Sequence, residues 1–149
     1  MKGQEILLVE DRDEDVFLTK RALTKANITN EVIVAKDGVE AIKYLIGDRD
    51  KPTPGGKPCP VLILLDLNLP RINGLEVLKR IRGNETTLMC PVVILTSSRE
   101  ETDIVSGCKL GANSFIRKPV NFDQFAEAVR QMGLYWLVLN EPPPLKTQQ

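Results

Sequence analysis

The sequence predicts an α/β fold, a doubly wound sandwich in which helices cover both faces of a five-stranded parallel sheet. Short apolar runs alternate five times with amphipathic helical segments along the chain. Such alternation is typical of parallel strands joined by crossover helices. The apolar runs are nearly continuous, as expected of strands that are buried on both faces. The length of 149 residues suits one domain with a proper hydrophobic core.

The five expected strands are short and apolar. They lie at residues 6–9, 31–35, 61–65, 92–95 and 113–116. A loop over 47–60, rich in proline and glycine, is expected on the surface before the third strand. The segments between strands carry apolar residues at helical spacing. The last helix, for example, has Phe122, Phe125 and Val129 on one stripe.

Pairs of polar residues mark where three of the helices begin. In a capping box, a short polar side chain at the helix start is followed three residues later by a glutamate. The pairs are Asp37 with Glu40, Asn73 with Glu76, and Ser98 with Glu101. The last helix is extended by an apolar run over 134–139. We expect one domain over residues 1–140, followed by a loose proline-rich tail over 141–149.

Composition excludes several classes of function. Twenty basic and twenty acidic residues balance, so no overall charge favours nucleic acid or an anionic membrane. No apolar run is long enough to span a bilayer, and no signal peptide is expected. Histidine is absent, which excludes catalysis by histidine and histidine-ligated metal sites. Cys59, Cys90 and Cys108 lack metal-ligand spacing, so we expect reduced cysteines in a cytoplasmic protein.

Polar residues follow four of the expected strands. The carboxyl ends of parallel strands meet at one edge of the sheet, so these side chains gather there. They are Glu10, Asp11, Asp66, Thr96 and Lys118. In the flavodoxin-like strand order 2-1-3-4-5, Asp11 and Asp66 face each other where the order reverses. Each residue alone could be a cap, a turn residue or a solvated charge, but the combination indicates a site.

The chemistry of this set points to phosphoryl transfer. Clustered carboxylates repel each other unless a cation lies among them, and Mg²⁺ prefers oxygen ligands. An ionised Asp66 could then act as nucleophile and form an aspartyl phosphate. The metal and Lys118 would stabilise charge on the transferring oxygens, and Thr96 could donate a hydrogen bond to the attached group. Because the chain has no histidine, a phosphohistidine donor must come from another protein.

These motifs resemble the receiver domain of two-component response regulators, the CheY-like family. The matching segments occur in the family's order and span nearly the whole chain. They are Leu8-Val-Glu-Asp11, Leu65-Asp-Leu-Asn-Leu-Pro70, Ile94-Leu-Thr-Ser97 and Lys118-Pro119. The loop over 47–60 and the extended last helix are similar to those of single-domain receivers associated with bacterial phytochromes.

The resemblance implies a role for each residue of the site. Asp66 would be the phosphoacceptor. The Mg²⁺ ligands would be Asp11, Asp66 and the backbone carbonyl of Asn68, with Glu10 assisting. Thr96 and Lys118 would stabilise the phosphoryl group, Lys118 would join Pro119 by a cis bond, and Phe115 would be the switch aromatic. Glu10 stands where aspartate is commoner in the family.

The resemblance also implies the partners. A sensor histidine kinase in the cytoplasm would supply the phosphoryl group, and an unidentified downstream protein would receive the signal. The chain would not be an enzyme beyond catalysing its own phosphorylation and dephosphorylation. The surface formed by the fourth helix, fifth strand and fifth helix would contact the partner or form a homodimer. Neither nucleic acid nor a membrane is expected as a partner.

Two alternatives compete with this interpretation. Asp11-Arg12-Asp13 after the first strand also fits the nucleophile motif of a haloacid-dehalogenase-like phosphatase, with Asp11 as nucleophile. That enzyme would leave Asp66 without a clear role. The other alternative is a receiver that binds a partner without being phosphorylated, against which the complete set of acids, hydroxyl and lysine argues.

Overall fold

The computed structural model of the chain describes residues 5–47, 59–97, 106 and 108–132. Within them, five parallel strands form one sheet in the order β2-β1-β3-β4-β5. The strands are β1 (Ile6–Val9), β2 (Val32–Ala35), β3 (Leu62–Asp66), β4 (Val92–Thr96) and β5 (Ser114–Arg117). The predicted fold class and strand order are confirmed. Strand β1 has the expected bounds, and each end of the other strands lies within one residue of its expected position.

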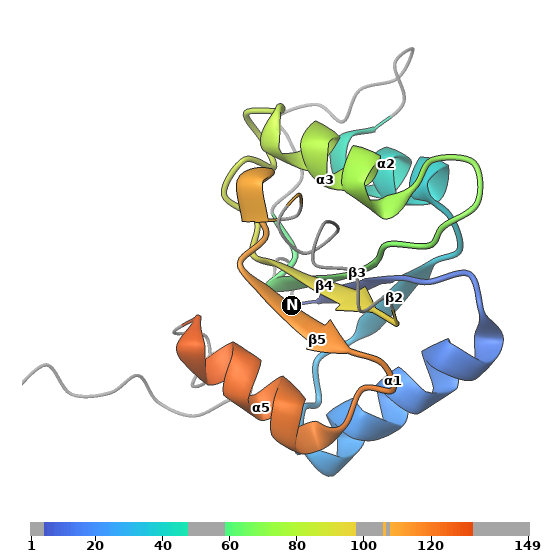
Figure 1. The fold of residues 1–149 in the computed structure, drawn as a ribbon, viewed down its shortest axis with the longest axis vertical. Helices are drawn as coiled ribbons and strands as arrows, with labels where there is room; N and C mark the ends of the chain where they lie inside the picture. Colours follow the sequence, from blue (N-terminus) through green and yellow to red (C-terminus); the bar gives the residue numbers. More distant parts are fainter. Residues whose placement is uncertain (1–4, 48–58, 98–105, 107, 133–149) are drawn as a thin grey trace, which may run out of the picture.

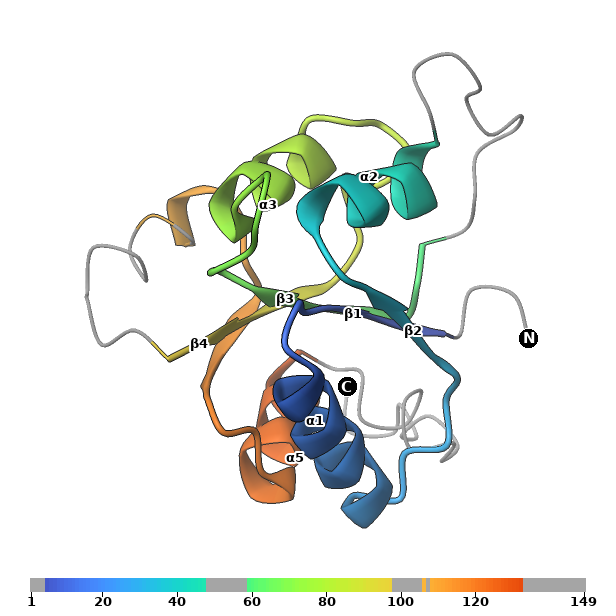
Figure 2. The ribbon, with the colours of Figure 1, turned by 90° about the vertical axis from the view of Figure 1, so that its right-hand side faces the viewer.

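Helices cover both faces of the sheet (Figures 1 and 2). On one face lie α1 (Asp13–Lys25) and α5 (Phe122–Gln131), and on the other lie α2 (Gly38–Ile46) and α3 (Gly74–Arg82). Successive strand residues point to opposite faces, so each strand supplies both cores. Leu8, for example, packs with the α1 and α5 side, while Leu7 packs with the α2 and α3 side. Burial on both faces explains the continuous apolar runs.

Two of the predicted capping pairs start helices as expected. The backbone N–H of Glu40 donates to Asp37 Oδ1 at 2.8 Å at the start of α2. The backbone N–H of Glu76 donates to Asn73 Oδ1 at 2.9 Å at the start of α3. Each contact satisfies a backbone donor that the first helical turn leaves free. The third pair, in 98–101, lies outside the described residues.

The start of α3 lies directly against the end of β3. A Cβ atom at Gly74 would lie 2.3 Å from the backbone oxygen of Asp66 and 2.7 Å from Leu67 Cα. The backbone N–H of Gly74 donates to the carbonyl of Leu67 at 3.0 Å. Glycine is needed here because of this close backbone approach. The packing fixes the path of the chain immediately after Asp66.

Two expectations from the sequence are wrong. Cys59 and Cys90 form a disulfide with their Cα atoms 5.5 Å apart, so they are not reduced cysteines. They precede β3 and β4, which are neighbours in the sheet, and the pairing of these strands brings them together. Phe122 is 44% exposed and does not continue the core stripe of Phe125 and Val129. Cys108 is free, as expected, and it is exposed.

Several predicted features lie outside the described residues. They are most of the loop over 47–60, most of the helix expected before β5, the apolar run over 134–139 and the tail over 141–149. Among the helices that are described, none has both the length and the apolar character needed to cross a membrane.

Candidate functional site

The polar residues predicted at the strand ends do lie at one edge of the sheet. Asp66 and Thr96 are the last residues of β3 and β4, and Glu10 directly follows β1. All three side chains are buried, with Glu10 fully enclosed. Asp11, the next residue, is exposed at the rim. Burial of two carboxylates side by side is costly unless a cation compensates their charge.

The three carboxylates form one cluster. Glu10, Asp11 and Asp66 each offer an oxygen, and these oxygens all lie within 4.8 Å of one another. Neighbouring strands β1 and β3 supply them, as the strand order requires. Hard oxygen donors at this spacing suit a divalent cation such as Mg²⁺ or Mn²⁺. The residues present therefore fit the metal that the sequence predicts.

Lys118 supplies the positive charge of the site. Its Nζ lies 2.5 Å from Glu10 Oε1, 3.0 Å from Asp15 Oδ2 and 3.3 Å from Asp66 Oδ2. Its backbone N–H donates to the carbonyl of Thr96 at 2.9 Å, which fixes the segment after β5 against β4. The peptide bond between Lys118 and Pro119 is cis, as the resemblance implied.

Asp15 is the residue that the sequence analysis missed. It lies in the first turn of α1 and is 17% exposed, and it reaches the ammonium of Lys118. A partial signal was present in the sequence, because Asp13, Glu14 and Asp15 follow Asp11 at the start of the helix. Which of these three carboxylates faces the edge of the sheet depends on the orientation of the helix, which is not visible in the sequence.

Burial and charge change the pKa values of two groups. Burial raises the pKa of Glu10 to about 7, and the nearby charge of Asp66 adds to this while Lys118 opposes it. Burial by itself lowers the pKa of Lys118, but hydrogen bonds to Glu10 and Asp15 and the charge of Asp66 outweigh it, and the net pKa is raised. Lys118 is therefore charged at neutral pH, and Glu10 titrates near neutrality.

The remaining predicted site residues are Asn68 and Phe115. The backbone N–H of Asn68 donates to Asp66 Oδ1 at 3.3 Å, so this loop curls over the carboxylate. Phe115 is half-buried on β5 and packs against the core on the α2 and α3 side. The open pocket at the site has a volume of about 250 Å³. Asp11, Arg12, Asp15, Asp66, Asn68, Ser97, Lys118 and Pro119 line it.

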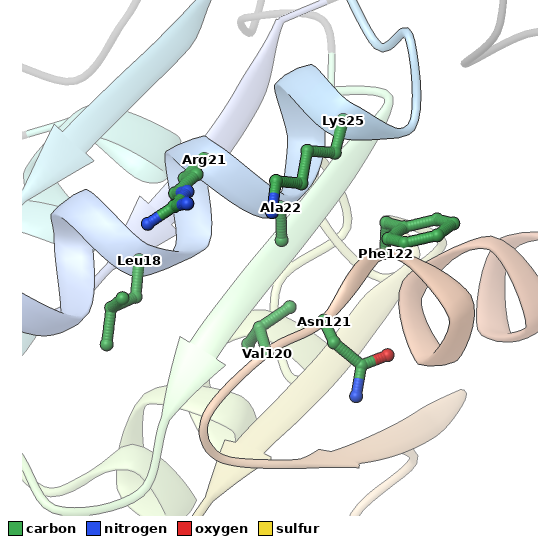
Figure 3. Close-up of a pocket in the computed structure, with 7 residues that line it drawn as sticks. All are labelled: Leu18, Arg21, Ala22, Lys25, Val120, Asn121 and Phe122. Atoms are coloured by element: carbon green, nitrogen blue, oxygen red, sulfur yellow. The ribbon is translucent and has the colours of Figure 1, made fainter.

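A larger pocket, of about 340 Å³, lies between α1 and the segment leading into α5 (Figure 3). Its lining residues are Leu18, Arg21, Ala22, Lys25, Val120, Asn121 and Phe122. None of these is acidic, so this pocket does not suit a metal ion. Its apolar floor and two cationic side chains suit a protein surface with apolar and acidic residues.

Comparison with known proteins decides the family. A family model described as the response regulator receiver domain matches residues 6–130. The chain belongs to this family. The match runs from β1 almost to the end of α5 and contains every residue of the site described above.

Relatives of similar length support this assignment. The response regulator Rcp1 of Synechocystis is 36% identical over 132 residues, which cover 89% of this chain and 88% of Rcp1. The probable methanogenesis regulatory protein FilR2 of Methanothrix harundinacea is 35% identical over 138 residues, covering 93% of this chain and 86% of FilR2. This receiver domain is thus homologous to two-component regulators, and the comparisons give no support to a haloacid-dehalogenase-like phosphatase.

Solved structures of similar proteins agree. The bacteriophytochrome response regulator RtBRR is 48% identical with a TM-score of 0.79, over 95% of this chain and 84% of RtBRR. The Mn²⁺-bound form of Rcp1 is 34% identical with a TM-score of 0.70, over 95% of this chain and 99% of Rcp1. The similarity to single-domain receivers associated with bacterial phytochromes, predicted from the sequence, is confirmed. The acidic cluster and the family together indicate a divalent-metal site.

Proposed function

We propose that this receiver domain accepts a phosphoryl group on Asp66 from a sensor histidine kinase in the cytoplasm and thereby switches a partner-binding surface. One observation carries the proposal. Lys118 Nζ lies 3.3 Å from Asp66 Oδ2, in an open pocket beside the carboxylate cluster. A nucleophilic carboxylate, a fixed cation and space for a phosphoryl group thus lie at one place, as phosphoryl transfer requires.

The chain's own residues would share the work. A carboxylate oxygen of Asp66 forms the new bond to phosphorus, while the bond from phosphorus to the donor's histidine nitrogen breaks and the electron pair stays on that nitrogen. Lys118 stabilises negative charge on the transferring oxygens, and Thr96 donates a hydrogen bond to the attached group. Water later attacks phosphorus, the bond from phosphorus to the Asp66 oxygen breaks, and inorganic phosphate leaves while Asp66 regains its carboxylate. The same groups of the site act in both steps, so the domain would catalyse its own phosphorylation and its own dephosphorylation.

We propose Mg²⁺ as the metal of this site. Asp11, Asp66 and the backbone carbonyl of Asn68 would hold it, and Glu10 would assist. The close approach of the oxygens of Glu10, Asp11 and Asp66, two of them on buried side chains, supports a cation in this position. When bound, Mg²⁺ supplies positive charge beside the transferring oxygens and reduces the repulsion among the carboxylates.

The groove of Figure 3 is our proposed docking position for the histidine kinase. It lies beside the site on the face that α1 and α5 cover, because Leu18 lies one turn beyond Asp15 on α1 and Val120 lies two residues beyond Lys118. A partner bound in this groove would lie next to the opening of the phosphorylation site, where its phosphohistidine must enter. The exposed ring of Phe122 offers an apolar anchor.

The output surface is proposed to lie on β5 and α5, together with the helix that precedes β5. A shallow pocket of about 230 Å³ lies between β5 and α5, with Phe115 and Arg117 among its lining residues. Phe115 lies on β5 three residues before Lys118, so a backbone shift at Lys118 after phosphorylation would reach this surface. A downstream protein, or a second copy of the chain, would bind here.

Mass mapping after treatment with acetyl phosphate tests the acceptor. We expect the added phosphoryl group on the peptide that contains Asp66, and no addition in the Asp66→Asn variant. Addition to Asp11 in the wild-type protein would contradict the proposal and favour the phosphatase alternative.

A further inference from the structure

We propose that Asp15 is a positioning residue, which holds the ammonium of Lys118 at the place where the phosphoryl oxygens arrive. Asp15 Oδ2 lies 3.0 Å from Lys118 Nζ, at hydrogen-bonding distance, and lines the same pocket as Asp66. The inference rests on the proposed function of Asp66. Through Asp15, helix α1, which otherwise packs on the hydrophobic core, would contribute directly to the phosphorylation site.

Asp15 differs from the other two partners of Lys118 because it does not belong to the carboxylate cluster. Glu10 and Asp66 each offer an oxygen to the cluster that suits a metal ion. A cation bound there competes with Lys118 for these two carboxylates. Asp15 lies outside the cluster, so it keeps its contact with Lys118 when the cluster is occupied. It is then the anchor that remains for the ammonium.

The position of Asp15 favours a defined contact. Its side chain is 17% exposed and that of Lys118 is 11% exposed, so water screens the pair little. Among the described residues, the other cation that pairs with Asp15 is Arg12, whose Nε lies 3.8 Å from the same oxygen and whose side chain is 67% exposed. An ion pair that open to solvent contributes little. The contact with Lys118 is therefore the dominant one for Asp15.

Fixing Lys118 matters because a free lysine side chain has many rotamers. Electrostatic stabilisation of a transferring group works best when the charge is already in place and needs no rearrangement during the reaction. Without Asp15 the ammonium would leave the pocket more often once the metal has engaged its other partners. Phosphorylation would slow, although Asp66 and the carboxylate cluster remain intact.

The chain offers a matched control for this proposal. Asp13 lies in the same first turn of α1 and pairs with Lys36 at the surface, away from the pocket. Changing Asp13 removes the same charge from the same helix end as changing Asp15 does. Any difference between Asp15→Asn and Asp13→Asn therefore reports the contact with Lys118 and not the general effect of a lost charge.

The test combines kinetics with a spectroscopic signal of Lys118. Phosphorylation by acetyl phosphate with Mg²⁺ is followed in the wild type, Asp15→Ala, Asp15→Asn and Asp13→Asn, and urea unfolding verifies that each variant is folded. Misplacement of a group that acts on the reacting atoms by about 1 Å can cost up to about 100-fold in rate, so we expect the maximal rate of Asp15→Ala to fall roughly tenfold. Asp15→Asn retains an acceptor oxygen, so its rate should lie between the rates of Asp15→Ala and the wild type. The rate of Asp13→Asn should match that of the wild type.

The side-chain ammonium signal of Lys118 in ¹⁵N nuclear magnetic resonance is the second measurement. A held ammonium exchanges its protons slowly enough to be seen. In the presence of Mg²⁺, which competes with Lys118 for Glu10 and Asp66, the signal should therefore persist in Asp13→Asn and disappear in Asp15→Ala. Either of two results would overturn the inference. One is a wild-type rate together with an unchanged signal in Asp15→Ala, and the other is an equal loss of rate in Asp15→Asn and Asp13→Asn. A wild-type protein that takes up no phosphoryl group would instead overturn the proposed function, and the ammonium signal would then decide alone whether Asp15 holds Lys118.

Discussion

Binding of a divalent cation should strengthen as the pH rises through neutrality, because Glu10 must lose its proton. Glu10 is fully buried beside Asp66, and burial raises its pKa to about 7. A cation in the cluster favours the ionised carboxylate, so binding releases a proton. With a pKa of about 7, roughly one tenth of Glu10 is ionised at about pH 6 and roughly nine tenths at about pH 8. The apparent affinity for Mg²⁺ should therefore rise about tenfold across this range.

Isothermal titration calorimetry with Mg²⁺ measures this directly. Repeating each titration in two buffers with different ionisation enthalpies gives the number of protons released. The Glu10→Gln variant cannot titrate, so its affinity should be lower and nearly independent of pH over the same range. The exposed Glu14→Gln serves as a control and should retain the wild-type profile. A flat wild-type profile, or an equal slope in Glu10→Gln, would refute the assignment of the proton to Glu10.

The same pKa shift has a consequence for stability without metal. The pKa of Glu10 is raised from its ordinary value of 4.5 to about 7 in the folded protein, so the folded state holds this proton more tightly than the unfolded state. The contribution of Glu10 to the free energy of unfolding is then most favourable below pH 4.5 and declines as the pH rises toward 7. Added Mg²⁺ should oppose this decline, because it binds only the folded cluster.

Three further predictions concern the fold and the docking groove. Gly74→Ala should lower the free energy of unfolding by about 1–3 kcal/mol, because its Cβ would meet backbone at the end of β3, at 2.3 Å. Gly83→Ala, whose nearest contact is 3.3 Å, needs a shift of only a few tenths of an ångström, so it should cost clearly less than Gly74→Ala in the same urea titration. Equal effects would contradict the packing argument. Reduction of the disulfide between Cys59 and Cys90, 31 residues apart, should lower the free energy of unfolding by about 3–4 kcal/mol. Urea unfolding with and without reductant measures this, and an unchanged free energy would argue against the bond. Phe122→Glu should slow phosphotransfer from the cognate kinase about tenfold but leave the rate with acetyl phosphate unchanged, and equal slowing of both reactions would disprove docking at the groove.

The fold was predictable because its signals are local. Continuous apolar runs and capping pairs such as Asp37 with Glu40 depend on neighbouring residues, and parallel topology then follows from their alternation. The cluster of Glu10, Asp11 and Asp66 was predictable for a related reason. Parallel strands place their carboxyl ends at one edge, so residues far apart in the sequence are brought together by topology alone.

What could not be predicted depends on orientation and long-range packing. Asp15 contacts Lys118 because of the orientation of α1 relative to the sheet, and the sequence does not show that orientation. The strand order places Cys59 and Cys90 before two neighbouring strands, but whether their sulfur atoms meet depends on how the segments before β3 and β4 approach each other. Phe122 shares the spacing of the core stripe, yet it lies at the first turn of α5, where the helix faces the groove of Figure 3 and not the core.

Phosphotransfer from a purified histidine kinase tests the central claim most directly. The kinase is first labelled on its histidine with radioactive phosphate and then mixed with the wild type, Asp66→Asn or Asp37→Asn, a control aspartate that caps α2. We predict that label moves to the wild type and to Asp37→Asn and does not move to Asp66→Asn. Label that transfers equally well to Asp66→Asn would show that Asp66 is not the acceptor.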